Sequence, residues 1–424
     1  MAPVTSLSAK IGTQVSYSAR DHSAARTQHY VFNQLIPYIG NKRKLLGLID
    51  QALPATARGK GHTFLDLFAG SGVVSRFAKS LGYQVLSNDW EPYTRVINGC
   101  YIGNNKPPAF RKFGGYEAAI NILNSLRPTS DWVTKNLCPR SDTRYDASRD
   151  RMFYMRKNGR RIDAIRNEIM EWRESGWISQ QEEYCLLAPL LYQACYNSNT
   201  SGVFKAFHNG WGGRTGTALY RIAGDLSLSP AVLHDNGARN KVFCLDAQTL
   251  ARQSSGATVD IAYLDPPYNQ HPYGSNYHVL NSIALWDKPT VQRSIAHGNK
   301  SAIRTDWRTD RRSSYNHAKE ARQAYARLLD TLNARFILTS YSTDGSIPLE
   351  DLLSTSVHRG HTSVVMRGYK RYRVSTQRFS QKPMNVEFIL VTDTSRRAKT
   401  SASALLRSIR RQERLVLINH PESA

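Results

Sequence analysis

The segment of the sequence best suited to chemistry is Asp265-Pro266-Pro267-Tyr268, which directly follows the apolar run 259–264. Two consecutive prolines cannot continue a strand or enter a helix interior, because each lacks an amide N–H and has a φ angle fixed near that of a turn. We therefore expect Asp265 to lie at the carboxyl tip of a strand, with Tyr268 just beyond it on a rigid loop.

These residues offer the groups needed to hold the exocyclic amino group of a nucleobase. The carboxylate of Asp265 and the carbonyl of Pro266 are neighbouring acceptors for the two N–H donors of such an amine, and the Tyr268 ring can stack on the planar base. Accepting both hydrogens favours a pyramidal nitrogen and frees its lone pair toward an electrophile. This is orientation and electrostatic stabilisation, not deprotonation by a strong base. The alternative is a proline-stiffened turn that carries a surface tyrosine.

A glycine-rich turn elsewhere in the chain could cradle a nucleotide-like ligand. The sequence DLFAGSG (residues 66–72) joins a predicted strand to a predicted helix. Gly70 and Gly72 permit a tight turn and close approach of a ligand to the backbone at the helix N-terminus. Such turns are also common as purely structural connections, and the sequence has neither G-x-x-x-x-G-K-[ST] nor a full G-x-G-x-x-G.

Two further acids follow predicted strands. Asp89 ends the second predicted strand, and Asp246 follows the apolar run at 241–245. An acid in the first of these positions typically accepts hydrogen bonds from ribose hydroxyls, so Asp89 favours a nucleoside site. Either acid could instead turn the chain or cap the helix that follows.

The elements that must position these residues alternate between strands and helices. Residues 62–89 have the pattern of a strand, a glycine turn, a helix and a second strand, which is a βαβ unit with parallel strands. Strand character returns at 241–246, 259–265 and 334–341. Residues 104–237 are mostly helical in pattern and include a loop rich in glycine and asparagine at 197–216. The sequence therefore predicts an α/β fold with a mostly parallel sheet and an inserted helical lobe.

The composition indicates a folded protein with a polyanionic partner. The 424 residues include 57 Lys plus Arg against 33 Asp plus Glu, which gives a net charge of +24. Nucleic acid is the natural partner for such a charge, because neutralising phosphates releases condensed counterions. The alternative is a basic protein whose charges are simply solvated.

Membrane, secreted and metal-binding proteins are disfavoured by the same sequence. No apolar run approaches the roughly 20 residues of a membrane span, and the first residues contain no secretory signal. The five cysteines form no C-x-x-C pair, and no histidine lies at ligand spacing with a cysteine or an acid. We therefore expect a cytoplasmic protein with reduced, mostly buried thiols and no metal.

The motifs together resemble the D12 class of adenine-N6 DNA methyltransferases, in the motif order of its alpha group. The resemblance covers residues 36–392 and is most specific at "YIGNKRKLL" (38–46), "DLFAGSG", "LDPPYNQHPYGSNYHVLNSIALWDKP" (264–289), "ILTSYSTDG" (337–345) and "GYKRYR" (368–373). It implies a Rossmann-like seven-stranded methyltransferase sheet from residues 31–103 and 238–394, with a mostly helical target-recognition domain at 104–237. Residues 1–30 would form a flexible arm, and residues 395–424 a basic tail.

The resemblance also implies S-adenosyl-L-methionine as the cofactor and assigns roles within its site. The methionine part would be held by Tyr38, Gly40, Asn41 and Lys42. The main cradle would be formed by Asp66, Phe68, Gly70 and Gly72. Asp89 would bind the ribose hydroxyls and Asp246 the cofactor adenine. Asp265 and Pro266 would hold the target amino group, Pro267 would stiffen this catalytic loop, and Tyr268 would stack on the target base.

Double-stranded DNA is the expected substrate, with the adenine extruded from the helix because a stacked base cannot reach a pocket. The loop 197–216 would contact the grooves through Asn199, Lys205 and Arg214, unless it only packs against the catalytic domain. The candidate phosphate contacts are Arg304, Arg308, Arg311, Arg312, Lys370, Arg371 and Arg373. For any one of these residues a solvated surface charge is the alternative.

Three other functions remain compatible with the sequence alone. An RNA adenine-N6 methyltransferase would use the same tetrad, and a cytosine-N4 enzyme would use the same amino chemistry. A catalytically silent DNA-binding subunit would keep the fold, although the intact tetrad and glycine loop argue against it. Adenine-N6 methylation of a specific DNA site, in a restriction-modification or phage-related system with a possible cognate restriction endonuclease, is the preferred hypothesis.

Overall fold

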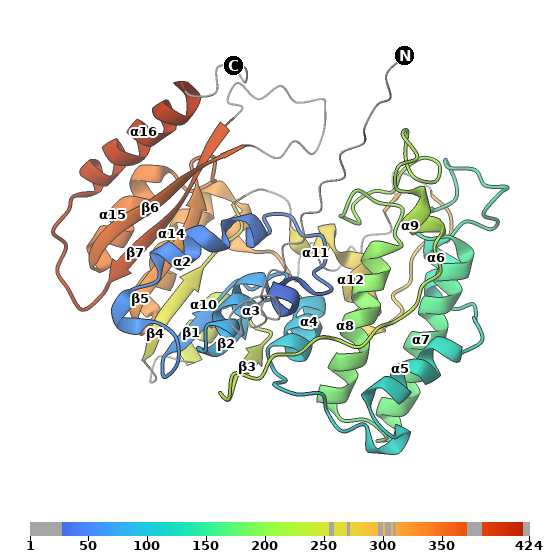
Figure 1. Cartoon of the computed structure of the whole chain (residues 1–424). Helices are drawn as coiled ribbons and strands as arrows, with labels where there is room; N and C mark the ends of the chain where they lie inside the picture. The colour runs from blue at the N-terminus through green and yellow to red at the C-terminus, as the bar shows by residue number, and fades with distance from the viewer. Residues whose placement is uncertain are drawn as a thin grey trace, which may run out of the picture.

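A seven-stranded sheet forms the centre of the molecule, with the strand order β3-β2-β1-β4-β5-β7-β6 (Figure 1). The computed structural model describes residues 28–253, 258–268, 272–295, 300–301, 307, 311–370 and 384–418. The strands are β1 (Thr63–Asp66), β2 (Gln84–Asn88), β3 (Lys241–Phe243), β4 (Val259–Leu264), β5 (Ala334–Ser342), β6 (His361–Lys370) and β7 (Met384–Asp393). Strands β1 to β5 pair in parallel, and β7 is antiparallel to both of its neighbours. This arrangement confirms the seven-stranded α/β fold.

The central strands are apolar because both faces of the sheet are covered. In β4, Ile261 and Tyr263 face one core cluster, and Ala262 and Leu264 face the other. All four are buried, since a parallel strand in the middle of a sheet has no solvent face. Strand β4 ends at Leu264, so the next residue, Asp265, lies at the carboxyl edge of the sheet.

Helices cover the sheet in two layers (Figure 1). The first core cluster includes residues of α2 (Leu46–Ala52), α3 (Val73–Ser80), α4 (Pro92–Tyr101) and α12 (His278–Leu285). The second includes residues of α10 (Ala247–Gln253), α14 (Ala318–Thr331), α15 (Leu349–Arg359) and α16 (Ala402–Ile418). The sheet is therefore the middle of three layers, as expected for a parallel sheet.

A helical lobe, made of helices that lie within residues 104–237, stands beside the sheet (Figure 1). Its helices are α5 (Tyr116–Ser125), α6 (Trp132–Leu137), α7 (Arg156–Glu174), α8 (Gln180–Tyr196) and α9 (Leu219–Ala223). Helix α8 starts with a capping box, in which Ser179 and Glu182 satisfy each other's backbone N–H groups. The lobe shares its apolar core with the sheet, mainly where α8 packs on α4. The boundaries 104 and 237 thus remain a prediction.

The two ends of the chain differ from the sequence expectation. The expected arm at 1–30 is too long, because Tyr30 is buried and its hydroxyl donates to the carbonyl of Tyr101 at 2.8 Å; residues 1–27 lie outside the described residues. The expected basic tail contains α16, which buries Leu405 and Ile409 against the sheet. The arm is thus shorter than expected, whereas a helix within residues 395–424 is compatible with a basic tail.

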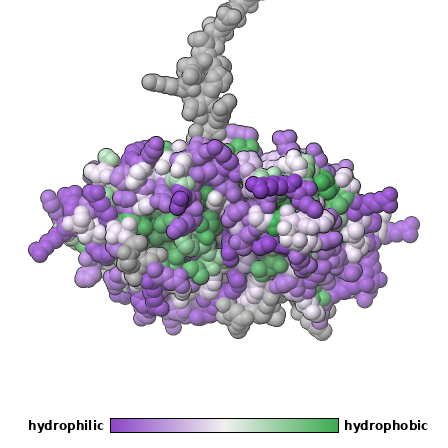
Figure 2. Space-filling model, turned by 90° about the horizontal axis from the view of Figure 1, so that it is seen from below, coloured by the Kyte–Doolittle hydropathy of each residue, from purple (hydrophilic) through white to green (hydrophobic). Residues whose placement is uncertain are grey.

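Surface and cysteine features fit the composition. Hydrophilic residues cover most of the face shown in Figure 2, with an apolar patch near its middle. Among the described residues, no helix is both long and apolar enough to cross a membrane. Four of the five cysteines are buried and all five are free thiols, as expected.

Candidate active site

A cavity of about 800 Å³, open to solvent, lies at the carboxyl ends of β1, β2, β3 and β4. This is where ligands bind in open α/β sheets. Nine of the predicted catalytic and cofactor-binding residues line it: Tyr38, Gly40, Phe68, Asp89, Asp246, Asp265, Pro266, Pro267 and Tyr268. Both predicted motifs, which are far apart in the sequence, therefore meet at one cavity.

The catalytic loop leaves β4 as the two prolines predict. Strand β4 ends at Leu264, and Asp265 follows at its tip. The carbonyl of Tyr268 accepts a hydrogen bond from Ser346 Oγ at 2.8 Å, and the Tyr268 ring packs edge-on against Tyr341 at 6.0 Å between centroids. The loop is thus held against β5 and the segment that follows it, which fixes the direction of the aromatic ring.

A buried lysine lies next to the catalytic carboxylate. Lys42 Nζ is 3.1 Å from Asp265 Oδ1 and 3.8 Å from Glu387 Oε2, and it lies 5.3 Å from the centre of the Tyr268 ring. Burial lowers the pKa of Lys42, but the charges of Asp265, Tyr268 and Glu387 outweigh this and raise it well above its usual range. Burial raises the pKa of Asp265, and Lys42 partly offsets that rise. Lys42, expected at the cofactor, therefore contacts the catalytic acid directly.

The glycine loop is tied to the second strand end. The N–H of Gly70 donates to Asp89 Oδ2 at 2.8 Å. Gly70 has a φ of +50°, and a Cβ at this position would meet the Tyr38 ring at 2.7 Å. Tyr38 in turn stacks on Tyr273 and Tyr277, with 5.1 Å between centroids in each pair. Glycine is thus required both by the backbone angle and by the close approach of an aromatic wall.

The strand-end acids combine structural bonds with exposure to the cavity. Asp89 accepts from the N–H groups of Gly70 and Glu91, and Asp246 caps α10 by accepting from the N–H groups of Gln248 and Thr249. Both side chains also line the cavity. A carboxylate has about four acceptor positions, so these bonds leave capacity for a ligand hydroxyl or amine. Asp89 therefore does hold a turn and Asp246 does cap a helix, and neither role prevents these acids from binding a ligand.

Asp66 lies beneath the glycine loop instead of on the cavity wall. It is 1% exposed, and its Oδ2 accepts from Ser75 Oγ at 2.7 Å. Its Oδ1 has no hydrogen-bond partner among the described residues. Burial raises the pKa of Asp66 to about 7, despite the hydrogen bond from Ser75. Asp66 thus supports the loop from below in this conformation.

The comparisons with known proteins agree with this geometry. A model of the D12 class N6 adenine-specific DNA methyltransferases matches residues 38–335. The chain belongs to this class. It is 32% identical to the Type II methyltransferase M.NlaIII of Neisseria lactamica over 79% of this chain and 92% of that protein. It is 31% identical to the Type II methyltransferase M.CviAII of Paramecium bursaria Chlorella virus 1, over 80% of this chain and 93% of that protein.

A third relative is longer. The Type II methyltransferase M.FokI of Planomicrobium okeanokoites is 31% identical over 81% of this chain, which spans 50% of the length of that protein. The alignments with the three relatives cover 79%, 80% and 81% of this chain. The family assignment makes this chain an adenine-specific DNA methyltransferase.

Several residues of the methyltransferase site were missed at the sequence level. The cavity is also lined by Trp90, Glu91, Tyr273, Tyr315 and Asn316. Burial raises the pKa of Glu91 to about 7, and its Oε2 accepts from Asn281 Nδ2 at 2.6 Å. Proximity to Asp89 in the sequence could have indicated Glu91, but no local signal marks Tyr315, which lies in a basic segment between β4 and β5. Asn41, a predicted cofactor residue, caps the short helix that starts at Lys42 and does not line the cavity.

The predicted recognition loop gives a mixed result. Asn199 is 0% exposed, its amide donates to the carbonyls of His208 and Gly210, and its Oδ1 accepts from the N–H of Gly212. This corrects the expectation for Asn199, because the groups that would read a base are used to shape the loop. Lys205 and Arg214 are exposed, so they stay candidates for DNA contact.

The predicted phosphate contacts divide into three groups. Arg311 lines the cavity and donates to the carbonyl of Trp90 at 2.9 Å, so its guanidinium faces the cofactor side. Arg312 is exposed and forms a two-bond pair with Glu320, at 2.5 Å and 3.1 Å. The rest lie outside the residues whose side chains are described: Arg304, Arg308, Lys370, Arg371 and Arg373.

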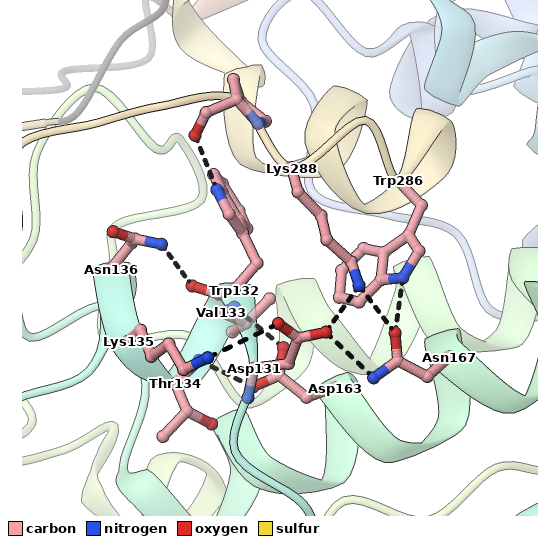
Figure 3. A network of polar contacts seen from close by, with 11 residues as sticks. Asp131, Trp132, Val133, Thr134, Lys135, Asn136, Asp163, Asn167, Trp286 and Lys288 are labelled. Atoms are coloured by element: carbon pink, nitrogen blue, oxygen red, sulfur yellow. Dashed lines mark hydrogen bonds and ion pairs between the residues drawn. The ribbon is translucent and has the colours of Figure 1, made fainter.

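A polar network joins the helical lobe to the segment that follows the catalytic motif (Figure 3). Lys288 Nζ donates to Asp131 Oδ2 at 2.6 Å and to Asn167 Oδ1 at 3.1 Å, and the Trp286 indole N–H donates to the same Asn167 oxygen at 2.8 Å. Trp286 and Lys288 both have positive φ angles, which non-glycine residues adopt only where the surroundings hold them. The network therefore fixes the lobe relative to the carboxyl end of α12 and the loop after it.

Proposed function

We propose that this enzyme uses S-adenosyl-L-methionine to methylate N6 of an adenine that has left the stack of duplex DNA at a specific site. The observation that carries the proposal is the meeting of Asp265, Pro266 and Tyr268 with the glycine loop and Asp89 at one cavity. One half offers acceptors and an aromatic face for a base, and the other half offers the groups of a nucleoside site.

The residues present fit this cofactor. Gly40 lines the cavity with a φ of +74°, and a Cβ there would come within 3.3 Å of the Tyr268 hydroxyl, so glycine lets the backbone approach the cavity closely beside Tyr268. Gly70 and Tyr38 would hold the methionine part, Asp89 the ribose hydroxyls, and Asp246 the amino group of the adenine ring. Phe68 and Tyr315, which meet edge-on at 5.4 Å, provide an apolar wall. The bound cofactor supplies an electrophilic methyl group on its sulfonium.

The chain's own residues prepare the target amine. Asp265 and the carbonyl of Pro266 accept its two hydrogens, which directs the nitrogen lone pair away from the ring and into the cavity. Lys42 holds one oxygen of Asp265, so the carboxylate cannot rotate freely. Tyr268 stacks on the base, and its packing against Tyr341 keeps the ring in place.

The helical lobe is the proposed DNA-reading domain, with Lys205 and Arg214 exposed on its glycine-rich loop. A net charge of +24 supports a polyanionic substrate. The relatives named as Type II methyltransferases support a role beside a cognate restriction endonuclease, and the proposed enzyme is cytoplasmic and needs no metal ion. Within the described residues, no cluster of three His, Cys, Asp or Glu side chains could hold a metal.

Transfer of labelled methyl groups from S-adenosyl-L-methionine to unmethylated bacterial DNA tests this function. We expect N6-methyladenine after digestion to nucleosides, and sequencing of the modified positions would give the recognition site. A parallel reaction on structured RNA is the control and should yield no product. Methylated RNA without methylated DNA, or cofactor binding without any transfer, would overturn the proposal.

A further inference from the structure

A buried acid on β7 lies beside the catalytic loop without any assigned role. Glu387 is 8% exposed, and its Oε2 lies 3.8 Å from Lys42 Nζ. Among the described residues, this oxygen accepts no hydrogen bond. Burying a carboxylate costs free energy that pairing must offset, and an apolar residue of similar size is often as stable or more so. The acid therefore calls for a reason other than stability.

The strand around Glu387 shows that the acid breaks a regular pattern. In β7, Ile389 and Val391 point toward the first core cluster, and Phe388 and Leu390 point toward the second. Glu387 has the parity of Ile389 and Val391, and it pairs with Ser342 where β5 ends at the catalytic edge. Such departures from an apolar pattern are expected where function requires them.

Lys42 connects this acid to the catalytic one. Asp265 lines the cavity, whereas Lys42 and Glu387 do not, so the ammonium contacts Asp265 from the protein side. A lysine paired with Asp265 alone would neutralise it and weaken it as an acceptor. With two carboxylates around one ammonium, the ionised group keeps a net charge of −1. That charge stabilises the positive charge that develops on the target nitrogen during methylation.

We propose that Glu387 is a positioning residue that acts on Asp265 through Lys42. It holds the lysine in place and shares its charge, so that Asp265 is both fixed and electron-rich. The proposal rests on the proposed function, because it takes Asp265 as the group that accepts the target amine. Glu387 itself touches neither substrate nor cofactor.

The isosteric substitution E387Q tests the proposal on the full-length enzyme with duplex DNA. We expect kcat to fall roughly ten- to a hundredfold, with the KM for DNA and the Kd for S-adenosyl-L-methionine within about twofold of wild type. Glu413→Gln is the matched control, since Glu413 is also a buried glutamate (7% exposed), pairs with Arg410 at 2.9 Å and lies on α16. It should keep wild-type kcat.

The pH profile separates positioning from general damage. The groups facing Asp265 are Lys42, Glu387, Asp66, Tyr263, Tyr268 and Tyr273. Removing the negative charge of Glu387 lowers the pKa of Asp265, so the acidic limb of the kcat profile should move to lower pH in E387Q. A loss of packing alone would lower the melting temperature and leave the limb in place.

A double-mutant cycle tests the route through the lysine. If Glu387 acts through Lys42, adding E387Q to K42Q should cause no further loss of kcat. Additive losses, or wild-type kcat and pH profile in E387Q, would overturn the proposal. The proposed function is rejected by a different result, namely that D265A still methylates DNA. An inactive D265A together with a fully active E387Q would reject only the role of Glu387.

Discussion

The ammonium of Lys42 lies 3.1 Å from Asp265 Oδ1; both side chains are largely buried, and Lys42 lies behind the part of the cavity wall that Asp265 forms. These residues are far apart in the sequence, since Lys42 precedes β1 and Asp265 follows β4. The N-terminal motif therefore contacts Asp265 directly, besides the cofactor contact that is proposed for it. Lysine is almost never buried without a partner, and Asp265 is the partner that allows Lys42 to be only 3% exposed.

The substitution Asp265→Ala should abolish methyl transfer and leave cofactor binding largely intact. The side chain accepts the target amine but is not needed to hold the ligand on the glycine-loop side of the cavity. Lys42 keeps Glu387 as a partner, so the fold should survive. We expect kcat to fall at least about a thousandfold. Calorimetric titration with S-adenosyl-L-methionine and a methylation assay on the same preparation check this, and normal DNA methylation by the variant would reject the assigned tetrad.

Asp66 should make the stability of the enzyme depend on pH. Its pKa is raised by burial to about 7 in the folded protein, whereas the unfolded chain has the ordinary value near 4. A raised folded-state pKa stabilises below the unfolded value, and this contribution is lost as the pH rises from about 4 to about 7. Asp66→Asn cannot ionise, so its melting temperature should fall less than that of wild type over this window.

The contribution of Asp66 is at most on the order of a few kcal/mol. The neighbouring Glu91, whose pKa is also about 7, affects both proteins equally and cancels in the comparison. Melting curves at pH 5 and pH 8 for both proteins measure the difference. If the melting temperatures of the two proteins depend on pH in the same way, Asp66 ionises at the same pH in the folded protein as in the unfolded chain.

Gly72 should not tolerate a side chain. Its φ is +77°, and a Cβ would overlap Asn98 Oδ1. The left-handed backbone costs about 1 kcal/mol for alanine and the overlap adds to it, so Gly72→Ala should lose about 2 kcal/mol or more of unfolding free energy. Gly47→Ala is the control, because Gly47 lies exposed in α2 with nothing within 4 Å of the added Cβ. It should be neutral or stabilising by up to about 1 kcal/mol in urea denaturation.

The sequence correctly predicted the features that depend on local sequence pattern. The apolar runs before Asp265 and around Leu65 indicate buried strands, and the two prolines fix the place where β4 ends. Whether a polar side chain faces a ligand or its own loop depends on long-range closure, which is why Asn199 was misassigned to DNA. Glu387 was missed for the same reason, since its partner Lys42 is brought to it only by the complete sheet. The acid in the run Val386–Val391 was the available signal.

The two exposed cations of the glycine-rich loop, Lys205 and Arg214, should contribute to DNA affinity without affecting catalysis. Each phosphate contact that is lost reduces the slope of log K against log salt by about 0.9, so K205Q/R214Q should lower it by about two. The Kd for DNA should rise, while kcat and the Kd for the cofactor stay unchanged. The control is K60Q/R335Q, which removes one exposed lysine and one exposed arginine near the amino ends of β1 and β5, opposite the cavity. If the control changes the slope as much as the loop variant, the effect is one of net charge, and the loop has no specific role in binding DNA.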